Sequence, residues 1–285
     1  MYNFQKPITL GWLSQILNIP FCGDGSFKIF GVANSNSPES NSLMFTKTTD
    51  LNIHDAVLIA PQDSISQNVL LSPNPRFDFI RALEVINSVI GFQLDDAKPQ
   101  VHSSVKLGEN VVIENGVFVG PNTVIESNVV INRGTYIGEN CLIRSNTSIG
   151  GDGFGYEREI NGKPIKFIHL GGVNIGNNVE VGSNTCIARG TLGNTLIEDN
   201  VKIDNLVHIA HNCIIRNGAF IIACSSLSGG VEIGRNAWVA PNATIIQKVK
   251  VGENAMVGLG SVVLKDVENG CVVAATPARL IRRPE

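Results

Sequence analysis

A histidine and a glycine that stand eighteen residues apart, His211 and Gly229, are of the types that acyl transfer requires. An imidazole can accept the proton of an attacking amine or hydroxyl. A backbone N–H that no side chain shields can bind the oxyanion of a tetrahedral intermediate. Asp204 could orient the imidazole, or could be a surface carboxylate without that role. A solvated surface residue is the alternative for His211, so the pair forms a candidate site only if the fold brings it together.

The fold that would do so is indicated by aliphatic residues at every sixth position. Twenty-four of them form three runs, from Val101 to Ile149, from Ile175 to Ile187 and from Ile197 to Val263. A short fixed period is typical of a solenoid, since one repeat cannot bury its own apolar face. Six residues supply one short strand and one corner, so three hexads make a triangular coil of eighteen residues. The sequence therefore predicts about eight coils, roughly 38 Å of stacked strands, with residues eighteen apart lying one above the other.

The corners of the coil have their own residue types. Asparagine and glycine, which tolerate the left-handed backbone conformation, recur three residues after the aliphatics. We expect such corners at Asn110, Gly116, Asn122, Asn140, Asn184, Gly218, Asn236 and Asn254. His211 follows Ile209 by two residues, which predicts a corner position with its side chain outside the core.

Residues 1–98 do not follow the hexad and predict a small α/β domain. Apolar periodicity predicts helices over 8–19 and 75–90, with strands over 27–32, 56–59 and 69–71. Residues 95–100 are the expected linker. The β-helix domain would then cover 99–265, followed by a tail over 266–285.

Two breaks interrupt the repeat. The first, between Ile149 and Ile175, adds about twenty residues, and solenoid insertions commonly build the functional site. Its aromatic residues and glycines favour a binding loop over 152–172 rather than a decorative one. The residues expected to bind there are Asp152, Phe154, Tyr156 and His169. The second break adds four residues around Arg189 to Asn194.

Composition excludes several classes of function. A net charge of −3 and a pI near 6.0 argue against a partner in nucleic acid or a membrane surface. No apolar stretch reaches 18 residues, which argues against stable membrane insertion. No metal-ligand cluster or phosphate-binding loop is present, so no bound metal is expected. The six cysteines form no C-x-x-C pair; Cys141, Cys186 and Cys213 are expected to be buried and reduced, which favours the cytoplasm.

Several motifs resemble one family. "GGDGFGY", "VNIGNNVEVGSNTCIARGTLGNT" and "VKIDNLVHIAHN", together with "GDGSFKIFGVANSNSPESNSLMF" and "NPRFDFIRAL" near the N-terminus, are similar to the UDP-3-O-acylglucosamine N-acyltransferases of lipid A synthesis. The resemblance implies a left-handed parallel β-helix and a homotrimer with active sites between neighbouring prisms. It also implies that His211 is the general base, Asp204 its supporting carboxylate and Gly229 the oxyanion donor. Within the last motif, Asn205 and Asn212 are expected to contact substrate.

The chain departs from the family pattern in its proposed uracil slot and at one corner. Phe45 is retained, but the expected asparagine and tyrosine are Thr48 and Leu51, which leaves a core phenylalanine as the alternative for Phe45. A second family histidine falls at Lys248, which could bind a phosphate or simply be solvated. The aspartate of the family's "DRG" stretch is Ala188.

The C-terminal segment departs most. "GLGSVVLKDVENGCVVAATPARLIRR" resembles the end of the short-chain sugar acetyltransferases that use acetyl-CoA. Lys265 and Arg279 could then contact CoA phosphates, unless the basic tail only solvates the last coil.

The sequence therefore predicts an N-acyltransferase that moves an acyl group from a thioester to the amine of a nucleotide-linked amino sugar. The donor would be an acyl carrier protein or CoA thioester that acts as co-substrate, with no tightly bound cofactor. Two variants remain open: a lipid A enzyme with a 3-hydroxyacyl donor, and a short-chain enzyme that acts on a dideoxy amino sugar carried by UDP or dTDP. An inactive sugar-nucleotide-binding scaffold is the alternative from another class.

Overall fold

The computed structural model describes residues 1–159 and 161–283. The chain forms two compact units, and one of them is discontinuous. The smaller unit combines residues 1–94 with residues 155–168, and the larger one comprises residues 95–154 and the chain from His169 onward. Most of the first insertion, expected within the β-helix domain, thus belongs to the smaller unit.

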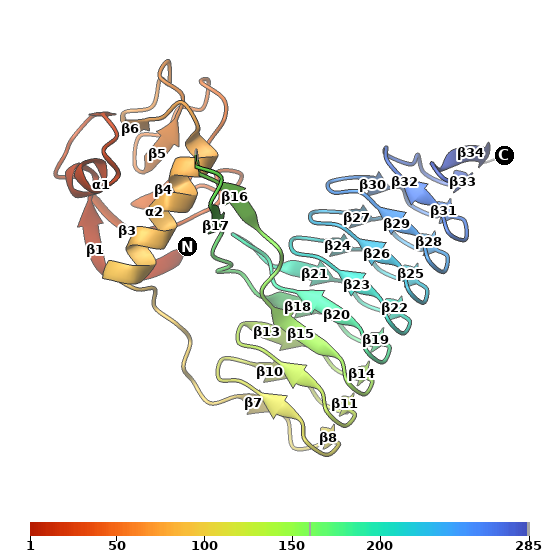
Figure 1. Cartoon of the computed structure of the whole chain (residues 1–285). Coiled ribbons are helices and arrows are strands. Elements are labelled where there is room, and N and C mark those ends of the chain that lie inside the picture. Colours follow the sequence, from red (N-terminus) through yellow and green to blue (C-terminus); the bar gives the residue numbers. More distant parts are fainter. Residues whose placement is uncertain (160, 284–285) are drawn as a thin grey trace. The chain divides into compact units, whose positions relative to one another are not determined.

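The larger unit is a left-handed parallel β-helix with three walls. Consecutive strands fall in turn on three sheets, so each strand pairs with the strand one coil away (Figure 1). Sheet 1 contains β7 (Gln100–Val101), β10 (Phe118–Val119), β13 (Thr135–Ile137), β18 (Val173–Ile175), β21 (Thr195–Ile197), β24 (Ile214–Ile215), β27 (Glu232–Ile233) and β30 (Lys250–Val251). Sheet 2 contains β8 (Lys106–Leu107), β11 (Val124–Ile125), β14 (Leu142–Ile143), β19 (Glu180–Val181), β22 (Lys202–Ile203), β25 (Phe220–Ile221), β28 (Trp238–Val239), β31 (Met256–Val257), β33 (Val272–Ala274) and β34 (Arg279–Arg282). Sheet 3 contains β9 (Val112–Ile113), β12 (Val130–Ile131), β15 (Ser148–Gly151), β20 (Cys186–Ala188), β23 (His208–Ile209), β26 (Ser226–Leu227), β29 (Thr244–Ile245) and β32 (Val262–Val263).

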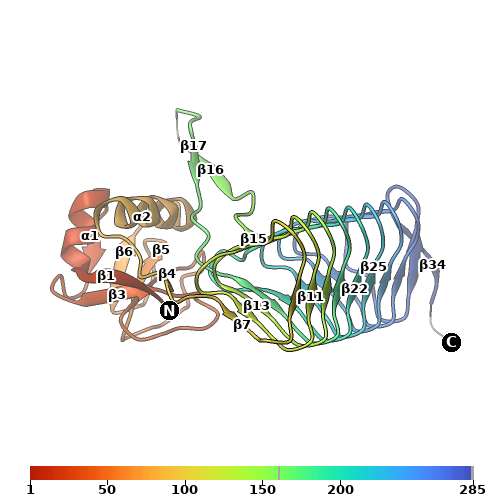
Figure 2. The ribbon, with the colours of Figure 1, turned by 90° about the horizontal axis from the view of Figure 1, so that it is seen from below.

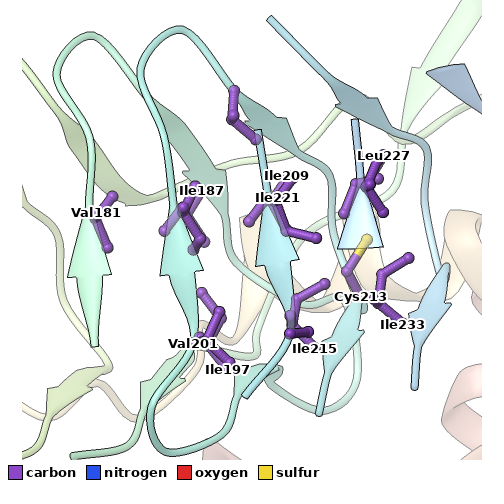
Figure 3. Close-up of a cluster of buried hydrophobic side chains, with 14 of the residues drawn as sticks. Val181, Ile187, Ile197, Val201, Ile209, Cys213, Ile215, Ile221, Leu227 and Ile233 are labelled. Atoms are coloured by element: carbon purple, nitrogen blue, oxygen red, sulfur yellow. The ribbon is translucent and has the colours of Figure 1, made fainter. Parts of the chain in front are cut away.

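The aliphatic residues of the hexad fill the interior of this coil, as predicted. Ile187, Ile209, Ile221 and Leu227 are fully buried, and Figure 3 shows such side chains between the strands of successive coils. Figure 2 shows the coils stacked along the axis of the β-helix. Leu107 in the first coil is an exception, because 52% of its surface is exposed. It has no preceding coil to pack against within this unit.

The corners confirm the role of asparagine. Asn110, Asn122, Asn140, Asn184, Asn236 and Asn254 all have positive φ angles between 54° and 58°, and Gly116 and Gly218 have positive φ as well. Leu206, Cys224 and Lys248 occupy the same left-handed slot with φ angles of 60°, 62° and 64°. A residue other than glycine, asparagine or aspartate is uncommon in this conformation, and all three lie in the coils around His211.

The C-terminal tail extends the solenoid rather than leaving it. β33 continues sheet 2 by pairing in parallel with β31, and β34 returns antiparallel to β33. Val273 thereby takes the place of a further hexad residue and is buried, although it follows its partner Val257 by sixteen residues instead of eighteen. The predicted boundary at residue 266 therefore does not separate the tail from the coil.

The smaller unit contains a six-stranded mixed sheet and two helices. The strands, in sheet order, are β1 (Tyr2–Thr9), β3 (Lys28–Val32), β4 (Ser42–Phe45), β5 (Val57–Ala60), β6 (Asn68–Leu71) and β2 (Phe21–Cys22). Helix α1 (Leu10–Leu17) begins later than predicted, because the Thr9 side chain caps it by accepting the Trp12 N–H. Helix α2 (Pro75–Val89) begins where it was predicted, with Asn74 as N-cap. None of the helices in residues 1–159 and 161–283 is long and apolar enough to cross a membrane.

The part of the first insertion that joins the smaller unit forms a hairpin. Its strands are β16 (Tyr156–Arg158) and β17 (Pro164–Lys166). Phe167 packs edge-on against Phe79 of α2, with ring centroids 6.1 Å apart, and Arg76 lies over the Phe167 ring. Arg76 also pairs with Glu157 of the hairpin. An aromatic contact and an ion pair thus hold the hairpin on α2, and the insertion is not a free loop.

The cysteines are all reduced, but not all buried as expected. Cys141 and Cys213 are buried, whereas Cys186 is exposed. Cys186 directly precedes the inward-facing Ile187, so the alternation of a strand turns its side chain outward.

Thiol labelling tests the packing of the interior. Burial raises the pKa of Cys213 from 9.0 to about 12, which lowers its thiolate fraction near pH 8 by a factor of roughly 1,000. In a short pulse of iodoacetamide, exposed Cys22 and Cys224 should be modified while Cys213 stays unmodified, as peptide mass spectrometry would show. Equal labelling of Cys213 and Cys224 in the folded protein would contradict a closed interior.

Candidate active site

His211 lies at the corner between sheet 3 and sheet 1, in the turn that follows β23. We call this edge of the β-helix the His211 ridge: it comprises Arg189–Asn194, His211–Asn212, Gly229–Gly230, Gln247–Lys248 and Lys265 in successive coils. The ring of His211 is half-buried and lies directly over Gly229 of the next coil. A Cβ atom at Gly229 would stand only 2.7 Å from Cε1 and 2.8 Å from Nε2 of His211. The stacking predicted from the spacing of eighteen residues is therefore present.

The backbone of Gly229 has a free donor beside this ring. Its carbonyl accepts the Lys248 N–H at 3.0 Å, whereas no acceptor in the described part of the chain takes its N–H. The equivalent corner N–H groups of Asn177 and Ser183 are taken by side-chain oxygens from neighbouring coils. The His211 imidazole and the free N–H of Gly229 thus lie side by side. These are the two groups that acyl transfer uses.

The two ends of the first insertion enclose His211 within the larger unit. A Cβ atom at Gly153 would lie 2.9 Å from both His169 Nε2 and His211 Cδ2. His169 is buried and packs edge-on against His211, with ring centroids 5.3 Å apart. Two of the predicted site residues, His169 and His211, therefore meet in space although 42 residues separate them.

Arg189 anchors the base of the same insertion. It donates to the carbonyls of Gly150 and Arg133 at 2.6 and 2.8 Å. Asp152 lies 3.8 Å from its guanidinium. Phe154, the next aromatic residue, is 87% exposed. Phe154 is thus a large apolar side chain held on a fixed base, and it remains a predicted substrate contact.

Two further predicted binding residues belong to the smaller unit. Tyr156 is exposed on β16. Phe45 ends β4 and packs against Phe79, with ring centroids 4.9 Å apart. Near it, the Thr46 and Thr48 hydroxyls hydrogen bond to each other at 3.1 Å. These contacts describe a packed aromatic cluster around Phe45, in line with the core alternative, and its nucleotide contact stays a prediction.

The structure does not place Asp204 beside His211 in one chain. Asp204 lies at the corner between sheet 2 and sheet 3, at the other end of the face that contains β23. Its carboxylate accepts the N–H groups of Asn205 and Ala223 at 2.7 and 3.3 Å. Asn205 accepts the Ser183 N–H at 2.7 Å. Within a single chain Asp204 and His211 thus lie at different corners, because seven residues span a whole face of the coil, and the support of His211 by Asp204 remains a prediction.

The basic residues predicted to bind phosphate lie in two places: Lys248 and Lys265 at the His211 corner, and Arg279 on sheet 2. Lys248 lies on the His211 ridge two coils beyond Asn212, and Lys265 lies at the same corner three coils beyond His211. At about 4.8 Å per coil, these positions are roughly 10 and 14 Å along the ridge. Arg279 lies on β34 in sheet 2 and does not join them. A phosphate-bearing arm that followed the ridge from His211 would meet the two lysines in turn.

A further histidine near the site is His208 on β23. Burial, and secondarily the charge of His211, lower the pKa of His208 below its ordinary value of 6.5. His208 is therefore neutral at physiological pH and adds no positive charge next to the His211 ring. Within residues 1–159 and 161–283, no group of three His, Cys, Asp or Glu side chains could hold a metal ion.

Sequence reasoning missed two groups that touch His211. Gly153 was part of a motif, but its contact with both histidines depends on how the insertion folds back. Asn212 was expected to contact substrate, yet its side-chain oxygen lies 3.0 Å from Nδ1 of His211. Its place directly after the histidine, in a left-handed corner slot with φ of 61°, was the available signal.

Models of hexapeptide-repeat families match parts of the chain. "Bacterial transferase hexapeptide (six repeats)" matches residues 116–151 and 230–265, and "Hexapeptide repeat of succinyl-transferase" matches residues 101–121. These matches fall on the coils of the β-helix.

Curated relatives and solved structures match longer segments. UDP-3-O-acylglucosamine N-acyltransferase of Helicobacter pylori is 49% identical over 88 residues, which are 31% of this chain and 26% of that protein. UDP-3-O-acylglucosamine N-acyltransferase 2 of Legionella pneumophila (strain Lens) is 44% identical over 130 residues, 46% of this chain and 38% of that protein. The chain thus matches less than half the length of either relative. Among solved structures, LpxA from Acinetobacter baumannii superposes with a TM-score of 0.59 at 26% identity, over 66% of this chain and 71% of that one.

Proposed function

We propose that this chain, a hexapeptide-repeat protein related to the UDP-3-O-acylglucosamine N-acyltransferases, transfers an acyl group from a thioester to the amine of a nucleotide-linked amino sugar. The observation that carries the proposal is the contact between the His211 ring and Gly229, whose N–H donates to no acceptor in residues 1–159 or 161–283. The nucleotide-linked amino sugar is inferred from the names of the relatives. The reaction is assigned to the His211 ridge because His211 lies over Gly229 there.

The reaction would proceed through a tetrahedral intermediate. The amine nitrogen attacks the thioester carbonyl carbon while His211 Nε2 accepts one amine proton. The carbonyl oxygen becomes an oxyanion, and the Gly229 N–H donates a hydrogen bond to it. The intermediate then collapses, the C–S bond breaks, and the leaving thiolate takes the proton from His211. The products are an amide and a free thiol, and the imidazole is again neutral.

The donor would lie along the His211 ridge as a co-substrate. A phosphopantetheine arm, whether from CoA or from an acyl carrier protein, carries phosphate at one end and the thioester at the other. Lys248 and Lys265 follow His211 along the ridge in that direction, and ammonium groups bind phosphate as point charges. Lys248 has its backbone in the left-handed conformation, which a corner usually reserves for asparagine or glycine.

A homotrimer would complete the site. Phe220, Trp238 and Met256 form an outward column on sheet 2, one per coil, and are 37%, 39% and 44% exposed. Such a column is typical of a protein–protein contact. Asp204, on the neighbouring corner, can act on a His211 only if that histidine belongs to another copy. Both observations favour an active site between copies.

Product analysis over a panel of substrates tests this function. UDP- and dTDP-linked amino sugars would be offered with acetyl-CoA and with a 3-hydroxyacyl carrier protein, and products identified by mass spectrometry. A product whose mass exceeds that of the amino sugar nucleotide by one acyl group shows that this nucleotide sugar and this donor are substrates. An inactive scaffold would give no product with any pair while its melting temperature still rose with the nucleotide sugar, and that result would reject the proposal.

A further inference from the structure

The second break of the repeat, around Arg189–Asn194, has no role in the proposed reaction, yet one of its residues reaches the catalytic corner. Thr191 donates its N–H and its hydroxyl to Oδ1 of Asn212, at 3.2 and 2.9 Å. The same oxygen lies 3.0 Å from Nδ1 of His211. Four extra residues thus bring a donor pair to the side chain that follows the histidine.

These contacts decide the direction of the hydrogen bond between Asn212 and His211. The Thr191 N–H can only donate, so the atom that faces it must be the amide oxygen. An amide oxygen can only accept, and the His211 Nδ1 must therefore carry a proton and donate it. The neutral ring then has its lone pair on Nε2, the nitrogen that lies over Gly229.

The position of Asn212 is itself fixed. Its backbone N–H donates to Thr195 Oγ1 at 2.9 Å, and that hydroxyl donates to the Ala188 carbonyl at 2.7 Å. A Cβ atom at Gly190 would lie 3.0 Å from Asn212 Nδ2, so the loop backbone packs against the amide. Asn212 is held by its backbone, its oxygen and its packing, and it has little freedom to turn.

Thr191 also connects this network to the first insertion. Its carbonyl accepts the N–H groups of Leu170 and Gly171 at 2.9 and 3.0 Å. These residues directly follow His169, the side chain that packs against the His211 ring. One residue of the short break therefore holds both the hydrogen-bond partner and the aromatic neighbour of His211.

We infer that Asn212, held by Thr191, is the positioning residue of the proposed reaction: it fixes His211 as the Nδ1–H tautomer and leaves Nε2 to accept the amine proton. This inference deepens the proposed function and depends on His211 being its base. Partners that orient a metal-bound histidine account for factors of about 10 to 100 in activity, and we expect a similar factor for a partner that orients a histidine base.

Asn212→Gly is the variant that tests it most cleanly. Glycine accepts the left-handed φ of 61° without strain, so the substitution removes the amide and leaves the corner. Asn254→Gly is the matched control, with φ of 55° and a side chain that accepts a long 3.4 Å bond from Asn236. We expect Asn212→Gly to lower kcat about 10- to 100-fold with KM within about two-fold, and Asn254→Gly to leave both unchanged. Thr191→Val should lower kcat less, because the N–H remains, and Thr191→Ser should restore it.

The tautomer gives a readout that does not require activity. Solid-state ¹⁵N NMR of histidine-labelled protein, with His211→Ala used to assign the signals, should show His211 protonated on Nδ1 in the neutral wild-type ring. Asn212→Gly should shift this signal toward the Nε2–H form. An unchanged tautomer in Asn212→Gly, or Nε2–H in the wild type, would overturn the inference, whereas a wild type that has the expected tautomer but no transferase activity would instead reject the proposed function.

Discussion

Replacing His211 with alanine should lower kcat of acyl transfer about 100- to 10,000-fold, the range over which general bases contribute. The physical reason is that, among the described residues, the histidines near His211 are poorer acceptors for the amine proton. Burial, and secondarily the charge of His211, lower the pKa of His208, which makes it a weaker base, and His169 is buried against Gly153 and the His211 ring. Steady-state rates of thiol release, with product confirmed by mass spectrometry, measure the effect.

His102→Ala is the control for this loss. His102 is another surface histidine of the β-helix, exposed in the first coil and hydrogen bonded to Ser104. Its removal should leave kcat and KM unchanged. If His211→Ala assembles normally and retains turnover within a few-fold of wild type, His211 is not the base.

Substituting Gly229 with alanine should lower kcat about 100-fold or more, because the added methyl group displaces the His211 base while the backbone N–H remains. The new Cβ would stand 2.7 to 2.8 Å from two ring atoms of His211, closer than any real Cβ contact, so the ring must move. Because Gly229 does not have a positive φ, the substitution does not strain the backbone, and the loss would come from the site itself.

Gly151→Ala separates this effect from a general cost of alanine. A Cβ at Gly151 would meet its nearest atoms only at 4.0 Å, so this variant should keep wild-type rates. Melting temperatures of both variants should stay close to wild type. Wild-type kcat in Gly229→Ala would show that the position of the His211 ring over this corner does not matter for the reaction.

The interior of the β-helix could be predicted from the sequence because its period is local. An aliphatic residue such as Ile221 every sixth position, with asparagine such as Asn236 at the corner, determines burial and backbone conformation with few alternatives. The stacking of His211 on Gly229 followed from the same count. Counting along the coil also shows why Asp204 is elsewhere: seven residues separate it from His211, and a corner recurs every six.

What could not be predicted depends on contacts between distant segments. The hairpin of the first insertion packs through Phe167 on Phe79, and nothing in the spacing of these residues indicates that they meet. The role of the second break could not be predicted either, because it depends on the hydrogen bonds that Thr191 donates to Asn212. A break in the repeat shows where the chain leaves the coil. The contacts of the inserted residues depend on tertiary packing, which the repeat does not encode.

The chemical nature of the bond in the product tests the central claim most directly. The product formed by the wild-type chain from an amino sugar nucleotide and an acyl thioester would be treated with alkaline hydroxylamine, which cleaves oxygen esters but not amides, and its mass measured again by mass spectrometry. N-acyl transfer by His211 predicts an amide, so the added acyl mass should survive the treatment. Loss of that mass would reveal an ester on a sugar hydroxyl, and no added mass at any stage would show that the ridge does not catalyse acyl transfer.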